Sequence, residues 1–88
     1  MQNGAHKMLS ENKRNKDIIK SVCSKAKLRE YISECSFDNE HDAEILNLIY
    51  LKNKDFSYVA DVIGLSYGWT VARHSCAARR LANLINTL

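Results

Sequence analysis

Residues that could support catalysis are present, but their spacing does not bring them together. His74 and Cys76 would form a thiolate–imidazole pair, yet two residues apart on a helix they point in different directions. Cys23 and Cys35 have the small, apolar character of buried residues. The chain contains neither a glycine-rich phosphate loop nor an HExxH motif. We therefore expect no enzymatic activity and no catalytic or cofactor-binding residues.

A second candidate for chemistry is the acidic stretch around His41. This histidine lies among Glu40, Asp42 and Glu44, and carboxylates with imidazole suit several divalent metals. Within one helical turn these side chains face different directions, so we expect local pairing of His41 with Glu40 or Asp42 and no metal site. The carboxylates are also favourable at the start of a helix, where the helix dipole attracts negative charge.

The strongest chemical signal is a set of arginines late in the chain. In the major groove of DNA, arginine can bind guanine through two hydrogen bonds, and arginines elsewhere contact phosphates. Arg73 is the predicted base-reading residue, and Arg79 and Arg80 are predicted phosphate contacts.

Aromatic residues near these arginines allow two interpretations. Tyr67 and Trp69 could contact a thymine methyl group or the sugar–phosphate edge, or they could close the hydrophobic core. His74 lies one turn beyond Thr70, and both a half-buried helix residue and a phosphate contact are compatible with that place.

The elements that would position these side chains are two helices joined by a tight turn. The first is predicted over Phe56–Ile63, with Asp55 as its N-cap. Gly64 can adopt the left-handed conformation that reverses the chain, and Ser66 can cap a second helix running to about Asn86. This pattern predicts a helix-turn-helix, in which the first turns of the second helix, including Ser66, approach DNA.

The preceding residues predict further helices. Residues 1–12 are expected to form a flexible arm, and 13–88 a single helical domain. Apolar residues within Lys13–Cys35 recur at helical spacing, but the stripe shifts near its middle, so one helix and two helices are both possible. Asp38 is predicted to cap an apolar helix that ends near Lys52–Lys54.

Composition limits the class of protein. The chain has 88 residues, 45% of them hydrophobic, no proline and few glycines, which predicts one all-α domain. Its net charge is +3, whereas residues 1–37 carry eight basic and four acidic residues, so the basic excess is N-terminal. Three cysteines without a CxxC pair, no long apolar run and no signal peptide predict a cytoplasmic protein that does not enter membranes.

The same residues resemble a known family of DNA-binding domains. The acidic-start apolar helix Asp42–Leu51, the pair Val59-Ala60, the turn Gly64-Leu65-Ser66 and the downstream Ala77 and Leu81 resemble the promoter-reading C-terminal domain (region 4) of bacterial sigma factors. They are also similar to the tetrahelical output domains of response regulators. The resemblance implies a four-helix, helix-turn-helix domain that binds DNA with its last helix and, in the sigma family, also touches RNA polymerase. The small size suits a phage or mobile-element version.

One feature of the second helix leaves its orientation open. The family usually places a β-branched core residue four positions after the turn serine, which is Thr70 here, but Val71 adjoins it. The choice rotates the exposed face by about 100°.

Two functions follow from the sequence. The first is a sequence-specific transcriptional regulator that binds double-stranded DNA. The alternative is a protein-binding, phage-type inhibitor or adaptor that docks on host RNA polymerase or another nucleic-acid enzyme. A homodimer through Lys13–Cys35, or through the apolar end of the last helix, is a further hypothesis; that end contains Leu81, Leu84, Ile85 and Leu88.

Overall fold

The computed structural model describes the backbone of residues 4–88 and the side chains from Glu11 onward. Within this range all regular secondary structure is helical and there is no strand, as the sequence predicts. The elements are α1 (Gly4–Lys20), α2 (Lys25–Glu34), α3 (Asp42–Leu46), the π-helix η1 (Asn47–Leu51), α4 (Phe56–Ile63) and α5 (Tyr67–Asn86).

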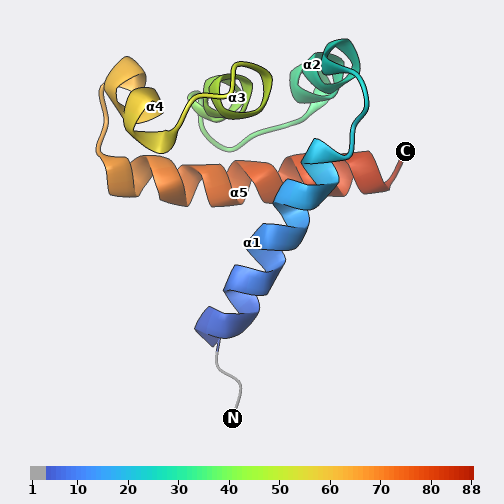
Figure 1. Ribbon diagram of the computed structural model, residues 1–88, viewed down its shortest axis with the longest axis horizontal. Coiled ribbons are helices and arrows are strands. Elements are labelled where there is room, and N and C mark those ends of the chain that lie inside the picture. The colour runs from blue at the N-terminus through green and yellow to red at the C-terminus, as the bar shows by residue number, and fades with distance from the viewer. Residues whose placement is uncertain (1–3) are drawn as a thin grey trace.

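Helix α5 is the axis of the fold. Helices α2, α3 and α4 lie along one side of α5, whereas α1 crosses α5 and extends away from the other helices (Figure 1). The central hydrophobic cluster draws on α1, α2, α5 and the α3–η1 segment, and consists of Ile19, Leu28, Ile32, Leu46, Tyr50, Leu51, Ala77, Ala78 and Leu81. Because α5 contributes mainly alanines to this contact, its neighbours can approach closely.

The N-terminal part forms two helices rather than one. Helix α1 ends at Lys20, and Ser24 begins α2 by accepting a hydrogen bond from the Lys27 amide at 3.2 Å. Helix α1 already begins at Gly4, so its backbone is helical where the sequence predicts a flexible arm over residues 1–12. That stretch lacks proline and holds good helix formers such as alanine and leucine, which explains the longer helix. Residues 1–3 of the predicted arm lie outside the described part of the chain.

The predicted cap of the central helix is wrong. Helix α3 begins at Asp42, and Asp38 caps nothing, because its carboxylate pairs with Arg80 at 2.8 Å. The turn before α3 satisfies its amides locally: the Asn39 amide donates to Asp42 Oδ2, and the His41 amide donates to Asn39 Oδ1.

The central helix changes character as it proceeds. It continues from α3 into the π-helical turn η1, so Tyr50 and Leu51 both become buried. A π-turn widens the helix by one residue and leaves carbonyl groups without their usual partners. The Lys54 amide donates to the Leu48 oxygen, and the Lys25 ammonium group donates to the Leu51 oxygen.

The two helices around the tight turn match the sequence prediction at both ends. Asp55 Oδ1 accepts from the Tyr58 amide at 2.9 Å, and Gly64 adopts φ 75°, ψ 29° at the end of α4. Ser66 Oγ accepts from the Trp69 amide at 3.1 Å. These caps fix the length and direction of α4 and α5.

The orientation of α5 is also resolved. Thr70 is fully buried and its hydroxyl donates to the Ser66 carbonyl at 2.8 Å, whereas Val71 is only half-buried. Thr70 therefore occupies the inward position, and the outward face of α5 follows from it.

Two glycines give a matched test of the turn. A Cβ at Gly64 would meet no atom within 4 Å, so the cost of Gly64→Ala comes from its left-handed backbone alone. We expect Gly64→Ala to lower the free energy of unfolding by about 1–2 kcal/mol. A Cβ at Gly68 would also meet no atom within 4 Å, but Gly68 has a helical backbone. Gly68→Ala should therefore raise the free energy of unfolding by about 0.5 kcal/mol. Urea denaturation measures both, and effects of the same sign would contradict this account of the turn.

Candidate nucleic-acid interface

Arg73, the predicted base-reading residue, is engaged within the domain. Its Nε and Nη2 atoms donate to the two carboxylate oxygens of Asp42 at 3.0 Å and 2.6 Å. Asp42 is fully buried and the Arg73 side chain is only 20% exposed. The hydrogen bonds to Asp42 also raise the pKa of Arg73. This geometry gives Arg73 a structural role linking α3 to α5, and disfavours the predicted contact with a base.

The two predicted phosphate contacts differ in availability. Arg80 makes a two-point ion pair with Asp38 at 2.8 Å and 3.2 Å, although this pair is exposed to solvent. Arg79 is exposed and has no ion-pair partner among the side chains that the structure describes. Arg79 is therefore the arginine of α5 whose charge is available to a phosphate.

The aromatic residues at the start of α5 divide between surface and interior. Tyr67 is 56% exposed and meets Phe56 edge-on, with 6.1 Å between ring centroids. Trp69 is half-buried and packs edge-on with the His41 ring, with 5.8 Å between the ring centroids. Tyr67 thus lies on the surface, whereas Trp69 helps to close the contact between α3 and α5.

A buried polar pair lies behind these residues. The Tyr50 hydroxyl and His74 Nε2 are 2.7 Å apart, and Phe56 packs edge-on against the imidazole with centroids 5.1 Å apart. Burial, assisted by the charge of Lys16, lowers the pKa of His74 to about 4, so this histidine is neutral at pH 7. His74 is therefore an interior residue, and its burial disfavours the phosphate contact that the sequence left open.

The outward face of α5 is lined by small residues. Gly68, Ala72 and Arg79 are exposed and lie opposite Thr70 on the helix. Beside them, a hollow of about 280 Å³ lies between α5 and the middle of α1, where Asn12 and Asn15 line it. The α5 backbone is therefore accessible at Gly68 and Ala72, with polar side chains of α1 beside Ala72.

Exposed positive charge is concentrated on the first two helices. Among the side chains from Glu11 onward, six exposed lysines and arginines lie on these two helices, against two on α5; the six are Lys13, Arg14, Lys20, Lys25, Lys27 and Arg29. This distribution follows the N-terminal basic excess of the sequence.

A separate exposed surface is apolar. Tyr58, Val62 and Leu65 are 46%, 48% and 39% exposed along the outer side of α4 and the turn after it. The ammonium group of Lys54 lies 4.8 Å from the centre of the Tyr58 ring. We call these three apolar residues the α4 patch.

Most apolar residues of the two predicted dimer surfaces are buried or half-buried within the chain itself. Leu81 is fully buried within the chain and Leu84 and Ile85 are half-buried, so Leu88 is the exposed apolar residue of that predicted surface. On α2, Leu28 and Ile32 are buried as well. The apolar stripes proposed for dimerisation therefore serve mainly the core of the described chain.

Two partners of the site were missed by sequence reasoning. The sequence predicts a favourable position for Asp42 in the first turn of its helix and no functional role for Tyr50. The partner of Asp42 lies 31 residues later in the chain, and the partner of Tyr50 lies 24 residues later. The signal that could have indicated Asp42 is its place three and four residues before apolar Ile45 and Leu46, which puts the carboxylate on the helix face that enters the core.

Comparison with known proteins identifies no relative. No family model matches the chain, and no curated protein and no solved structure matches it. None of the helices in residues 4–88 combines the length and apolar character needed to cross a membrane. Among the described side chains, no cluster of three or more histidines, cysteines and carboxylates could hold a metal ion.

Proposed function

We propose that this protein is a sequence-specific DNA-binding transcriptional regulator in which α4, the Gly64–Ser66 turn and α5 act as a helix-turn-helix. The observation that carries the proposal is the start of α5. Its first turn is capped by Ser66, follows a left-handed glycine, and presents Tyr67 and Gly68 to solvent. A helix presented in this way can enter the major groove with its N-terminal residues first.

The residues assigned to DNA differ from the arginine-centred prediction. With Thr70 inward, Tyr67 is the large exposed side chain at the tip of α5, and Gly68 and Ala72 allow the backbone to approach DNA. Tyr67 would contact base edges or a thymine methyl group, and Arg79 would contact a phosphate about three turns later. Ser66 acts through its cap, and Arg73 acts by positioning α5 against α3. The resemblance to the sigma-factor C-terminal domain supports this arrangement and extends the proposal to a contact with RNA polymerase.

Selection from a random duplex pool at two salt concentrations tests the proposal. We expect the wild-type protein to enrich one sequence motif, and Tyr67→Ala to lower affinity for that motif about tenfold or more. Arg79→Gln should weaken all sequences alike and reduce the salt slope by about 1. Tyr58→Ala, which removes an exposed tyrosine on α4, is the matched control and should leave the motif unchanged. Equal enrichment of the motif by wild type and Tyr67→Ala would exclude base contact by Tyr67.

The α4 patch favours a second candidate function, a protein-binding inhibitor or adaptor. Three apolar side chains on one helix face and its turn can anchor a protein interface. Such an interface changes little with salt, whereas binding through phosphates weakens steeply. If the duplex pool yields no binding at low salt, and Tyr58→Ala abolishes binding to purified RNA polymerase, the adaptor function replaces the regulator.

A further inference from the structure

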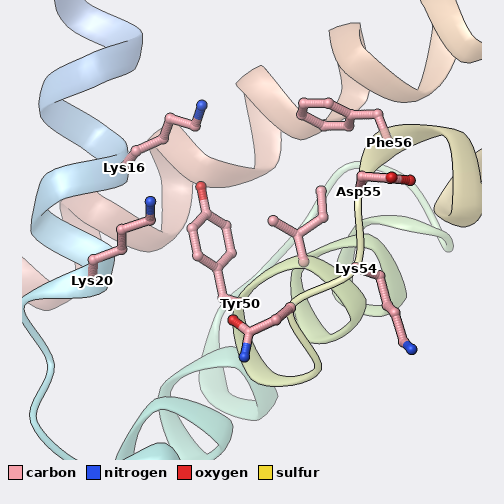
Figure 2. A pocket seen from close by; sticks show the side chains of 8 residues that line it. Lys16, Lys20, Tyr50, Lys54, Asp55 and Phe56 are labelled. Atoms are coloured by element: carbon pink, nitrogen blue, oxygen red, sulfur yellow. The ribbon is translucent and has the colours of Figure 1, made fainter.

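A groove separates α1 from the segment that links η1 to α4. Its volume is about 480 Å³, and α1 contributes Lys16 and Lys20 to one wall. Tyr50 and Phe56 lie opposite them (Figure 2), and Asn53 also lines the groove. The groove is distinct from the outward face of α5, because no residue of α5 lines it.

The α1 wall of the groove carries unpaired positive charge. Lys16 and Lys20 are four residues apart and therefore share one face of the helix. Figure 2 shows both side chains leaving α1 on the side where Tyr50 lies. Neither forms an ion pair with a described carboxylate, whereas Lys13 pairs with Asp17 at 3.1 Å and Lys27 with Glu30 at 3.7 Å.

The opposite wall adds little negative charge. Asp55 is the acidic residue that lines the groove, and its Oδ1 atom is engaged by the Tyr58 amide as the cap of α4. In Figure 2 its carboxylate points away from the two lysines of α1. Lys54 lines the same side, but its ammonium group also points away from the lysines of α1 and lies 4.8 Å from the centre of the Tyr58 ring. The positive charge that faces the groove is therefore that of Lys16 and Lys20.

Tyr50 supplies a fixed hydroxyl between the two lysines. Its ring is buried in the core, and its hydroxyl lies beside Lys16 and Lys20 in Figure 2. His74 holds that hydroxyl from behind at 2.7 Å. When the neutral imidazole carries its proton on Nε2, it donates to Tyr50, and the Tyr50 proton is then directed elsewhere than His74.

We propose that this groove binds a phosphate group, held by the ammonium groups of Lys16 and Lys20 and by the hydroxyl of Tyr50. Two lysines and a hydroxyl suit an anion with several acceptor oxygens, and a phosphate in an open groove can belong to a polymer. The inference deepens the proposed function and rests on it in naming the DNA backbone as the source of the phosphate. A free phosphate-bearing molecule has the same chemistry and is distinguished by the experiment.

The test combines a groove variant with a charge-matched control. Lys16→Gln/Lys20→Gln removes two charges from the groove, and Lys13→Gln/Lys27→Gln removes two exposed charges outside it. Fluorescence anisotropy with a labelled duplex should show an affinity loss of about tenfold for the groove variant, with a salt slope smaller by about 1. The control should lose less than about threefold, because exposed charges away from the contact are screened by salt. Tyr50→Phe should lose affinity while retaining the ring, and thermal unfolding verifies each fold.

Nuclear magnetic resonance with inorganic phosphate identifies the source. Amide shifts at Lys16, Lys20 and Asn53 that vanish in the groove variant, together with its loss of duplex affinity, would establish a site for a DNA phosphate. The same shifts without any duplex binding would retain the phosphate site and reject the regulator. Duplex binding that is equal in groove variant and control, without phosphate-induced shifts in the groove, would overturn the site and retain the regulator. Equal duplex binding with those shifts would reject DNA as the source of the phosphate and assign the groove to a free phosphate-bearing molecule. Absence of both signals would overturn both.

Discussion

Arg73→Ala is expected to lower the free energy of unfolding by about 3–5 kcal/mol. The substitution leaves the Asp42 carboxylate fully buried and without its cationic partner, and among the described residues only the Asn39 amide continues to donate to it. A charge in that position loses its hydration without compensation, which is costlier than losing an exposed ion pair. Because small domains are stable by only about 5–15 kcal/mol, a large part of the population should unfold on mild heating. Urea denaturation at neutral pH measures the loss.

The ion pair of Arg80 with Asp38 gives the matched control. It has the same two-point geometry, but its side chains are 45% and 57% exposed. Arg80→Ala should therefore cost less than about 1 kcal/mol. Replacing both members of the buried pair, as Asp42→Leu/Arg73→Met, should recover much of the stability lost in Arg73→Ala, because no buried charge remains. Equal costs for Arg73→Ala and Arg80→Ala would refute the structural role of Arg73.

Arg73→Ala cannot by itself distinguish a lost base contact from a displaced α5. A loss of binding in Arg73→Ala would follow from displacement of α5 even if the guanidinium never touched a base. Tyr67 and Arg79 are better probes because both are exposed and neither joins an ion pair or hydrogen bond among the described side chains. Their substitution changes the surface of α5 and leaves the Asp42 contact intact.

The features that the sequence predicted correctly are local ones. The ends of α4 and α5 depend on Asp55, Gly64 and Ser66, whose side chains or backbone act within three residues of their own position. The all-helical class follows from helical spacing and the absence of strand patterns. Thr70 and Val71 remained equivalent in sequence because both are β-branched, and only packing under α5 distinguishes them.

The features that could not be predicted depend on contacts distant in the chain. Asp38 has the residue type and place of an N-cap, yet an arginine 42 residues later offers it a stronger, charged partner. Arg73 likewise has the place of a base-reading residue, and its partner became available only because α3 packs against α5. The groove depends on where α1 lies relative to η1, although the spacing of Lys16 and Lys20 already placed them on one helix face.

Lowering the pH from 7 to 4 is expected to remove about 3 kcal/mol of stability through His74 alone. In the folded chain, burial and the charge of Lys16 lower the pKa of His74 to about 4, whereas the unfolded chain titrates near the ordinary value of 6.5. Between these values the unfolded state binds more protons, so the free energy of unfolding decreases as the pH decreases. The contribution is fully present above about pH 6.5 and is lost on passing to about pH 4.

His74→Gln isolates this effect from the carboxylates that titrate in the same range. Glutamine is neutral at every pH and can still hydrogen-bond the Tyr50 hydroxyl, while His41 and all acidic residues are unchanged. The difference in unfolding free energy between wild type and His74→Gln, followed by urea denaturation from pH 7 to pH 4, should therefore shift by about 3 kcal/mol in favour of the variant. If the unfolding free energies of the two proteins change in parallel with pH, protonation of His74 costs no stability in the folded chain. A shift of this size would establish that the hydroxyl of Tyr50 is held by a neutral imidazole at pH 7.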